Sequence, residues 1–361
     1  MSKSIEDLIG QHPEKPNFFA DWLTCEDILS EPKANKKYRK LSENLPHKSS
    51  AIEEIAQLLI KHLITNTDID SLRNRKKKIY EKYSYEQHLE AQELIPTKGT
   101  VRQGNLGEII FIEYLKALGK YDFLVYKFEY NPNISQSMKG DDILMFDKDN
   151  LRNILLGEAK YRSNSKATII EEILESFGGT TKLPISLTFI TRVLAKTDIN
   201  LSNQLSEIQT EIKHGEKSII NAGFIISDKN ISNTLEKHDF SGDFALTDKV
   251  IDELSKIDPN YPVGCLRLLI GKEYKTFTLL RERIQKEIFN IETGKPDEKK
   301  QKAKDWVAKK YKDIIYKYSS KKLNDSLFFL SIGVDNLDEY LEGSFEKAYQ
   351  SLGTPETLRY K

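Results

Sequence analysis

The sequence predicts a mixed α/β fold in which helices flank a central mixed sheet, and three observations predict this class. The spacing of apolar residues changes from helical to extended near residue 120, where one helix is followed by three strand-like runs. Another helix and a strongly apolar run over residues 218–227 come after these strands. Hydrophobic residues make up 39% of the 361-residue chain, which is enough to build a core and excludes a disordered protein.

The N-terminal region, residues 1–95, is predicted to be mostly helical. Its first half is polar and is broken by four prolines, so only one short packed helix is expected there, around Trp22–Leu29. Apolar residues recur at three- and four-residue spacing from Ser49 to Leu63, which predicts an amphipathic helix. A second helix is expected from about Asp68 to Leu94.

Residues 96–230 are predicted to form the core of the fold. A helix over Gly104–Leu118 is expected to stop at Gly119. Strands are predicted over Phe123–Tyr130, Asp141–Phe146 and Asn153–Tyr161, with a polar turn between the last two. The remaining elements expected here are a helix at about residues 167–177, two helices within 184–214 and a buried strand over 218–227.

The C-terminal region, residues 231–361, is predicted to be an α/β accessory region. Two strand-then-helix pairs are expected in it: Val263–Ile270 with Phe277–Phe289, and Leu327–Val334 with Leu337–Tyr349. Between the two pairs, the segment Lys295–Lys322 holds eleven lysines against four acidic residues.

Composition excludes several classes of function. The 55 basic and 55 acidic residues cancel, so a nucleic-acid site must be a local patch rather than a globally basic surface. Two cysteines, Cys25 and Cys265, cannot form a disulfide framework or a cysteine-rich zinc site. The sequence shows no transmembrane-length apolar run, no secretory signal and no phosphate-binding loop of the ATPase type. A soluble cytoplasmic protein without ATPase activity of its own is therefore expected.

The residues most typical of catalysis lie on two neighbouring predicted strands. Asp141 and Asp142 begin one strand, and Glu158-Ala-Lys160 ends the next. If these strands are antiparallel and joined at residues 147–153, Asp142 falls opposite Glu158. The same register pairs Leu144 with Leu156 and Phe146 with Ile154. Because side chains alternate along a strand, Glu158 and Lys160 share a face.

This arrangement predicts metal-assisted hydrolysis of phosphodiester bonds. Two opposed carboxylates repel each other unless a cation lies between them, and oxygen ligands suit Mg²⁺ or Mn²⁺. A lysine two residues further along can orient a water and stabilise charge that develops on a phosphate. The predicted catalytic residues are therefore Asp142, Glu158 and Lys160.

Two alternatives stay open from the residues alone. Neighbouring strand residues face opposite ways, so a register shifted by one residue would put Asp141 in the site in place of Asp142. Glu-x-Lys by itself is uninformative because the chain holds five copies, and this pair can also be a surface salt bridge or a decayed site. The copy at Glu158 stands out because an acid-tipped partner strand, a turn and a following helix accompany it.

Glu108 is a further candidate, on the helix that precedes the three strands. It follows Gly104 and Gly107, two glycines that allow a helix to approach the sheet closely. A carboxylate there would complete the metal site directly or through water. The alternative is a first-turn glutamate that complements the helix dipole.

These residues together resemble the PD-(D/E)xK, or restriction-endonuclease-like, nuclease superfamily over about residues 100–230. The resemblance implies a restriction-endonuclease-like core in which Asp142, Glu158 and Lys160 are the metal-binding acid, the second acid and the lysine of the motif. It also implies that Glu108 matches the glutamate of the first core helix and that the backbone carbonyl of Ala159 lies near the metal. One departure is Gly140, which stands where some members have a proline.

Within this superfamily, three runs are similar to the HamA family: Gly104-Asn-Leu-Gly-Glu108, Gly140-Asp-Asp-Ile-Leu and Leu156-Gly-Glu-Ala-Lys-Tyr161. This resemblance implies the nuclease subunit of the Hachiman anti-phage system, which is encoded beside a helicase, HamB. It thereby implies DNA as the substrate, Mg²⁺ (or Mn²⁺) as the cofactor, and a HamB-like helicase as a partner that restrains cleavage. No membrane is implied.

Alternative functions remain at this stage. One is a non-catalytic DNA-binding or scaffold subunit of such a complex, which an intact Asp-Glu-Lys set disfavours. Another is an RNA-directed nuclease. The basic segments Arg73–Lys78 and Lys295–Lys322 suit contact with a nucleic-acid backbone, but segments of this kind are more often simply a solvated helix face.

Overall fold

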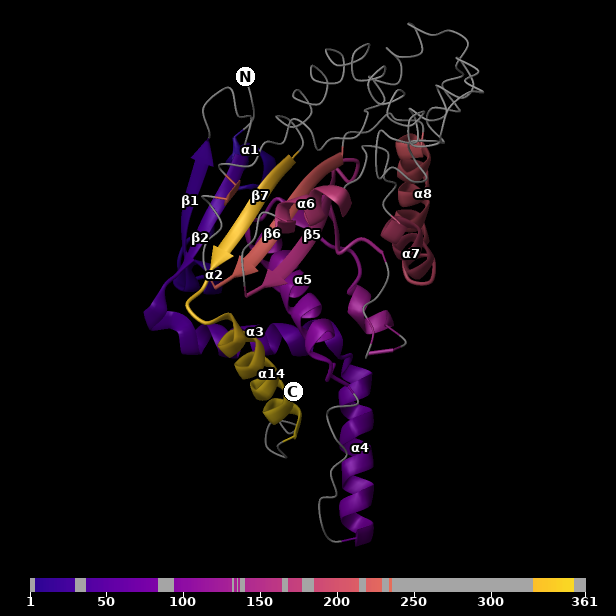
Figure 1. Cartoon of the computed structure of the whole chain (residues 1–361). Helices are drawn as coiled ribbons and strands as arrows, with labels where there is room; N and C mark the ends of the chain where they lie inside the picture. The colour runs from indigo at the N-terminus through magenta and orange to yellow at the C-terminus, as the bar shows by residue number, and fades with distance from the viewer. Residues whose placement is uncertain are drawn as a thin grey trace, which may run out of the picture.

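One mixed seven-stranded sheet organises the structure. The computed structural model describes residues 4–29, 37–83, 94–131, 140–163, 168–176, 185–213, 219–228 and 327–353, together with residues 133, 134, 136, 234 and 235. The strands are β1 (Leu23–Leu29), β2 (Lys37–Glu43), β3 (Tyr121–Asp122), β4 (Ile143–Asp147), β5 (Ile154–Arg162), β6 (Ile219–Ser227) and β7 (Leu327–Gly333). They lie in the order β1-β2-β7-β6-β5-β4-β3, and Figure 1 shows β7 in yellow between β2 and β6.

The middle of the sheet is parallel and its two margins are antiparallel. β2, β7, β6 and β5 pair in parallel, whereas β1 pairs with β2, β4 with β5 and β3 with β4 in antiparallel fashion. Parallel strands need covered faces, and helices supply that cover on both sides here. The predicted mixed fold class, with helices around a mixed sheet, is therefore confirmed.

The first face of the sheet packs on the largest hydrophobic core. α5 (Gly99–Ala117) lies against β5 and β6, and α3 (Lys48–Leu63) packs between α5 and α14 (Leu337–Gly353). The short helices α1 (Ile5–Ile9) and α2 (Phe18–Trp22) join the same core. On β4 and β5, the residues that face this core are the odd-numbered ones, such as Met145 and Leu155.

The second face is covered by three other helices. α6 (Thr168–Ser176) packs on β5 and β6, and the pair α7 (Ile185–Leu194) and α8 (Ile199–Lys213) covers β4 and β5. Even-numbered residues such as Leu144 and Leu156 point into this layer. Both faces of β4 and β5 are thus apolar in the middle, and Glu158 and Lys160 lie towards the end of the pair that is away from the β4–β5 turn.

Gly157 allows α5 to lie tightly against β5. A Cβ atom at this position would come within 2.7 Å of the Phe111 ring and 2.9 Å of the Ile143 Cβ, distances that real Cβ atoms essentially never show. The Phe111 ring in turn stacks on Phe224 of β6, with 4.7 Å between the ring centroids. The missing side chain of Gly157 therefore sets how closely the helix that carries Glu108 approaches the strand that carries Glu158.

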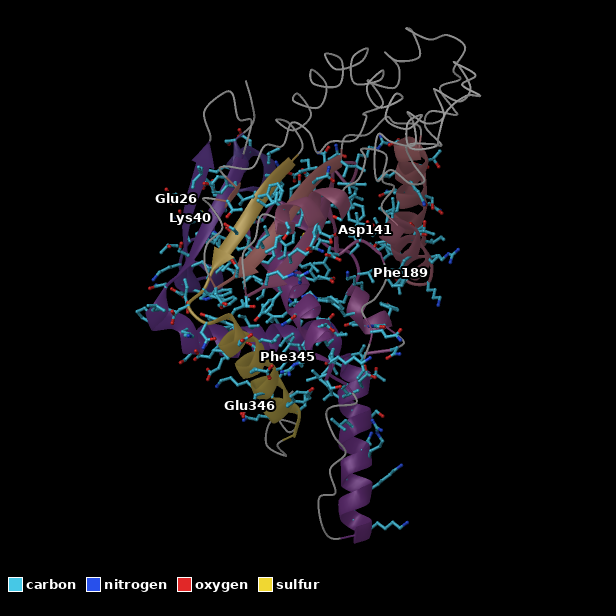
Figure 2. The ribbon with its side chains drawn as sticks, in the orientation of Figure 1. Glu26, Lys40, Asp141, Phe189, Phe345 and Glu346 are labelled. Carbon is cyan, nitrogen blue, oxygen red and sulfur yellow. The ribbon has the colours of Figure 1, made fainter. Side chains whose placement is uncertain are left out.

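The N-terminal region contains two strands that the sequence pattern does not predict. The short helix expected around Trp22–Leu29 is a correction, because α2 ends at Trp22 and β1 occupies the rest of that segment. β1 and β2 carry charged residues in opposed positions, such as Glu26 and Lys40. Figure 2 shows these two residues near one edge of the sheet and Asp141 towards the other edge. The sheet consequently takes strands from all three regions of the chain.

The predicted strand over Phe123–Tyr130 is also wrong. β3 ends at Asp122, and the segment continues into a 3₁₀ helix, η3, over Lys127–Tyr130. The aromatic residues of this segment do not belong to a strand. Phe123 and Tyr126 instead pack against the ring of His62 on α3, at centroid distances of 5.6 and 4.8 Å. The segment is a compact turn held against α3, and it brings Lys127 towards the start of β4.

The other predicted elements agree with the structure where they are described. The predicted helices over 49–63, 104–118, 167–177 and 337–349 correspond to α3, α5, α6 and α14, and the pair within 184–214 corresponds to α7 and α8. α4 (Asn66–Tyr83) begins as predicted, and its continuation over 84–93 lies outside the described residues. The predicted elements Val263–Ile270 and Phe277–Phe289 and the basic segment Lys295–Lys322 also lie outside them.

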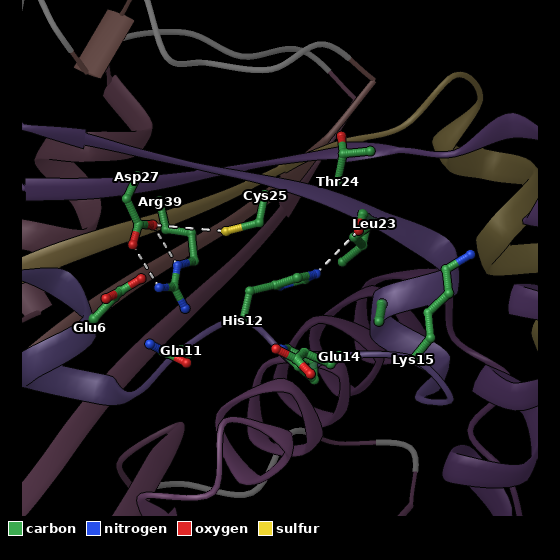
Figure 3. Close-up of a pocket in the computed structure, with 12 residues that line it drawn as sticks. Glu6, Gln11, His12, Glu14, Lys15, Leu23, Thr24, Cys25, Asp27 and Arg39 are labelled. Atoms are coloured by element: carbon green, nitrogen blue, oxygen red, sulfur yellow. Dashed lines mark hydrogen bonds and ion pairs between the residues drawn. The ribbon is translucent and has the colours of Figure 1, made fainter.

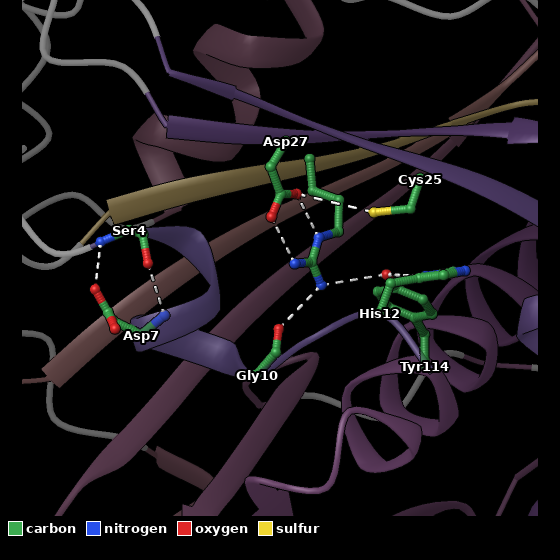
Figure 4. A network of polar contacts seen from close by, with 8 residues as sticks. Ser4, Asp7, Gly10, His12, Cys25, Asp27 and Tyr114 are labelled. Atoms are coloured by element: carbon green, nitrogen blue, oxygen red, sulfur yellow. Dashed lines mark hydrogen bonds and ion pairs between the residues drawn. The ribbon is translucent and has the colours of Figure 1, made fainter. Parts of the chain in front are cut away.

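A buried arginine fastens the N-terminal segment to the sheet and to α5. Arg39 is only 1% exposed, and its Nε and Nη2 atoms bind the two carboxylate oxygens of Asp27 at 2.6 and 2.7 Å. Its Nη1 donates to the Gly10 carbonyl and to the Tyr114 hydroxyl, as Figure 4 shows. Two strands, a loop and a helix therefore meet at one guanidinium group.

Candidate functional site

The register between β4 and β5 is the one predicted from the sequence. Leu144 pairs with Leu156 and Phe146 with Ile154 in an antiparallel ladder that runs to Ile143 opposite Gly157. Continuing this register by one residue places Asp142 opposite Glu158. The two acids consequently meet where the strand pair ends.

Glu158, Lys160 and Asp142 are joined by short contacts at this end of the strands. Lys160 Nζ lies 2.7 Å from Oε1 of Glu158, and both side chains are largely buried. Asp142 Oδ2 accepts a hydrogen bond of 3.0 Å from the backbone N–H of Ala159, the residue between them. The structure thus brings together the four residues that the sequence placed in the site on β4 and β5.

Asp141 has a different set of contacts from Asp142. Its Oδ2 accepts a hydrogen bond from the backbone N–H of Ser186 in the first turn of α7, and its own N–H donates to the Ser186 hydroxyl. This reciprocal pair, with both distances at 3.0 Å, fixes α7 to the start of β4. Asp141 therefore faces α7, whereas Asp142 faces β5.

Gly140 explains the missing proline before the acids. Its φ angle of 144° is open to glycine but excluded for proline, whose ring fixes φ near −65°. A Cβ atom here would also lie 2.9 Å from the Ser186 hydroxyl oxygen. The contact between Ser186 and Asp141 thus requires glycine at position 140.

Glu108 reaches the same region from α5. Gly107 beside it packs against β5, where a Cβ atom on Gly107 would meet the Cβ atoms of Tyr161 and Ala159 at ordinary contact distances of 3.7 and 3.9 Å. A Cβ atom on Gly104 would meet nothing within 4 Å, so the approach of this helix to the sheet requires neither glycine. The Glu108 carboxylate forms an ion pair with Lys127 of η3. Lys127 is a residue of the site that the sequence does not reveal, because a single lysine in an aromatic run reads as part of a strand.

The carboxylates of the site influence one another electrostatically. Burial raises the pKa of Glu108 to about 7, and the charges of Asp142 and Glu158 add to this effect while Lys127 opposes it. Burial also raises the pKa of Glu158, and the charge of Asp142 raises it further. Asp142 and Glu158 therefore lie close enough to Glu108 for their negative charges to act on its carboxylate.

We expect the pH dependence of folding stability to report on Glu108. Its pKa rises from 4.5 to about 7 on folding, so between these values the folded protein holds a proton that the unfolded chain has lost. The contribution of Glu108 to the free energy of unfolding is fully present below pH 4.5. This free energy falls by about 3 kcal/mol as the pH rises from 4.5 through 7. Glu108→Gln should lack this fall when urea unfolding is compared at pH 5 and pH 8. An equal loss of stability in both proteins would contradict the assignment.

The donors at this site fit a hard divalent cation. Across the described ranges, no three side chains of His, Cys, Asp or Glu converge closely enough to hold a metal by themselves. Mg²⁺ is commonly held by only one or two carboxylates and retains several waters, so Asp142 and Glu158 with the Ala159 carbonyl form a suitable oxygen set. A cation between the two acids would also relieve the repulsion that raises the pKa of Glu158.

A cavity elsewhere in the described part of the chain is unsuited to this chemistry. A cavity of about 660 Å³ opens beside His12, Cys25 and Arg39 (Figure 3). His12 is occupied at both ring nitrogens, by the Tyr114 hydroxyl at 3.0 Å and the Leu23 carbonyl at 3.2 Å. Burial raises the pKa of the Cys25 thiol to about 11, which keeps it protonated and weakly nucleophilic.

The basic segment Arg73–Lys78 is not part of the site. It lies on α4, which Figure 1 shows extending away from the sheet. Its described side chains Arg75, Lys77 and Lys78 are exposed.

None of the described helices combines the length and the apolar character that crossing a membrane requires.

Comparison with known proteins adds two findings. The family model described as HamA matches residues 16–279 of this chain, a range that includes Glu108, Asp142, Glu158 and Lys160. The Hachiman protein HamA of Bacillus cereus is 34% identical to this chain over 234 residues, which cover 64% of this chain and 84% of that protein.

Proposed function

The chain belongs to the HamA family, and on that premise we propose that it is a metal-dependent DNA nuclease, the effector subunit of an anti-phage defence complex. The proposed reaction is hydrolysis of phosphodiester bonds. The proposed core is of the PD-(D/E)xK, restriction-endonuclease-like type, with Asp142, Glu158 and Lys160 as its catalytic residues. The name of the Bacillus cereus relative, a Hachiman protein, supports the role in defence.

One observation carries the proposal of nuclease chemistry. The β4–β5 register puts Asp142 opposite Glu158 and leaves Lys160 on the same face as Glu158, at the end of the strand pair that is away from its turn. A surface salt bridge would not require a third buried acid, yet Glu108 is held near the same carboxylates by α5. Three acids and a lysine at one strand end are costly to bury without a function.

Each residue has a distinct proposed task. Asp142, Glu158 and the Ala159 carbonyl would hold Mg²⁺ or Mn²⁺, and Glu108 would complete the site directly or through water. The bound cation would polarise the phosphate and lower the pKa of a water. Lys160 orients the attacking water and stabilises negative charge on the phosphate, and its ion pair with Glu158 keeps its ammonium group in place. The buried surroundings strengthen these charge interactions.

A partner that restrains cleavage is part of the proposal. An unrestrained DNA nuclease would damage the DNA of its own cell, so a complex that limits access to Asp142, Glu158 and Lys160 is expected. By family resemblance the partner is a HamB-like helicase, and the compartment is the cytoplasm. A DNA signal or ATP-driven movement of the helicase would then release the nuclease.

Incubation of plasmid DNA with the purified full chain tests these proposals together. Cleavage should require Mg²⁺ or Mn²⁺, should stop with EDTA, and should fail with Ca²⁺, whose longer and looser bonds position water poorly. The chain and its helicase should elute from size exclusion as one complex that cleaves less than the free chain. Cutting in excess EDTA would overturn the metal mechanism. Cleavage of RNA alone would identify an RNA-directed nuclease, and DNA binding without cleavage a scaffold subunit.

A further inference from the structure

We propose that Lys127 is the positioning residue that sets the direction of Asp142, an inference that rests on the proposed function for its catalytic meaning but on the fold for its geometry. Lys127 Nζ donates to the carbonyl oxygens of Asp141 and Asp142, at 3.0 and 2.8 Å, and forms the ion pair with Glu108. The ammonium group of Lys127 thus lies against three oxygens: two carbonyl oxygens that accept its hydrogen bonds and one carboxylate oxygen that pairs with its charge.

The two carbonyl contacts act on the peptide groups at either side of Asp142. The Asp141 carbonyl belongs to the peptide before the Asp142 Cα atom, and the Asp142 carbonyl belongs to the peptide after it. β4 begins only at Ile143, so the strand ladder does not fix these two groups. Lys127 thereby determines the backbone dihedral angles that aim the Asp142 carboxylate at β5.

The segment that delivers Lys127 is itself held firmly. The Tyr126 ring packs edge-on against His62, and the Phe128 side chain is buried. His62 Nε2 lies 2.7 Å from Oε1 of Glu113 on α5, and Lys61 Nζ lies 2.8 Å from the same oxygen. A polar triad on α3 and α5, in which His62 and Glu113 are buried and Lys61 is exposed, therefore supports the turn that carries Lys127.

The third contact links the two acids that come from different elements. Through Lys127, the carboxylate of Glu108 on α5 is joined to the backbone of Asp142 at the start of β4. Lys160 pairs with Glu158 on the same face of β5 in a separate contact. The two lysines thus have different tasks: Lys160 faces the reacting phosphate, and Lys127 holds the acids in position.

Amide hydrogen exchange in the metal-free full chain tests this inference without relying on cleavage. The Ala159 N–H is protected by the side chain of Asp142, so a misdirected carboxylate should expose it. Lys127→Met should accelerate exchange at Ala159 by about tenfold or more, with little change at the Tyr161 amide on the same strand. Lys127→Arg should restore most of the protection. Lys148→Met, at an exposed position on the β4–β5 turn, is the matched control and should exchange like the wild type.

Metal binding supplies the second measurement. Calorimetric titration with Mn²⁺ should show affinity about tenfold weaker in Lys127→Met than in the wild type, because the ligand is no longer held in place. Unchanged exchange at Ala159, or equal acceleration at every β5 amide, would overturn the positioning role. If Lys127→Met accelerates exchange only at Ala159, the positioning role of Lys127 is upheld. If in addition the wild-type protein neither binds Mn²⁺ nor cleaves DNA, the proposed nuclease is refuted.

Discussion

Glu158→Ala and Lys160→Ala are each expected to reduce DNA cleavage by about 10³-fold or more while the protein stays folded. The two side chains share the β5 face at the strand end, and each is the other's ion-pair partner. Removing either one eliminates a cation ligand or the ammonium group that stabilises charge on the phosphate. Plasmid cleavage under saturating Mg²⁺ measures the loss, and circular dichroism reports the fold.

Matched variants make this result specific to the site. Asp142→Asn should behave like the two alanine variants, whereas Asp141→Asn should retain substantial activity because an amide can still accept the bond from Ser186. Glu172→Ala, which removes an exposed partner of Arg162 near the end of β5, should cleave normally. Wild-type cutting by Glu158→Ala would refute the site, and a reversed result for the two aspartates would show that Asp141 is the ligand.

Arg39→Met is expected to lower the free energy of unfolding by about 3 kcal/mol, the range typical of breaking a buried ion pair. Methionine fills similar space but leaves Asp27 without its two charge-assisted bonds and the Gly10 carbonyl without a donor. Urea unfolding of the full chain at neutral pH measures the difference. The loss should be the same with and without Mg²⁺, since Arg39 lies on β2, away from the candidate site.

The neighbouring residue supplies the control for Arg39. Lys40 pairs with Glu26 across the same two strands at 3.0 Å, but both side chains are substantially exposed. Lys40→Gln should therefore cost less than about 1 kcal/mol. If Arg39→Met is no more destabilising than Lys40→Gln, the buried network does not fasten the N-terminal segment.

The candidate site at the end of β4 and β5 was predictable because the sequence patterns that place it are local. β4 and β5 are joined by a short turn, and alternating apolar residues on both strands leave one register that buries Leu144, Leu156 and their neighbours. That register fixes the position of Asp142 relative to Glu158 without any knowledge of the rest of the fold. The helical period of α5 places Glu108 on a nearby element for the same reason.

The elements that escaped prediction depend on distant partners. β2 pairs with β7, which lies far along the chain from it. The spacing of apolar residues within 37–43 does not by itself predict a strand. Lys127 was missed because the apolar side chains of Phe123 and Tyr126 suggested a strand, whereas they pack against His62 of α3. In both cases a tertiary contact overrides the local periodicity on which prediction from sequence depends.

The place of β7 in the sheet has a consequence for synthesis of the protein. β2 ends at Glu43 and β7 begins at Leu327, yet β7 is the strand that joins the β1–β2 hairpin to β6. At about 5–20 residues per second, a ribosome needs roughly 15–60 s to make the chain between them. The edge of β2 is unpaired throughout that time, and the edge of β6 is unpaired from the synthesis of Ser227 onward; both edges are open to non-native pairing. We therefore expect the sheet to close only after β7 has left the ribosome, however early its other strands are made.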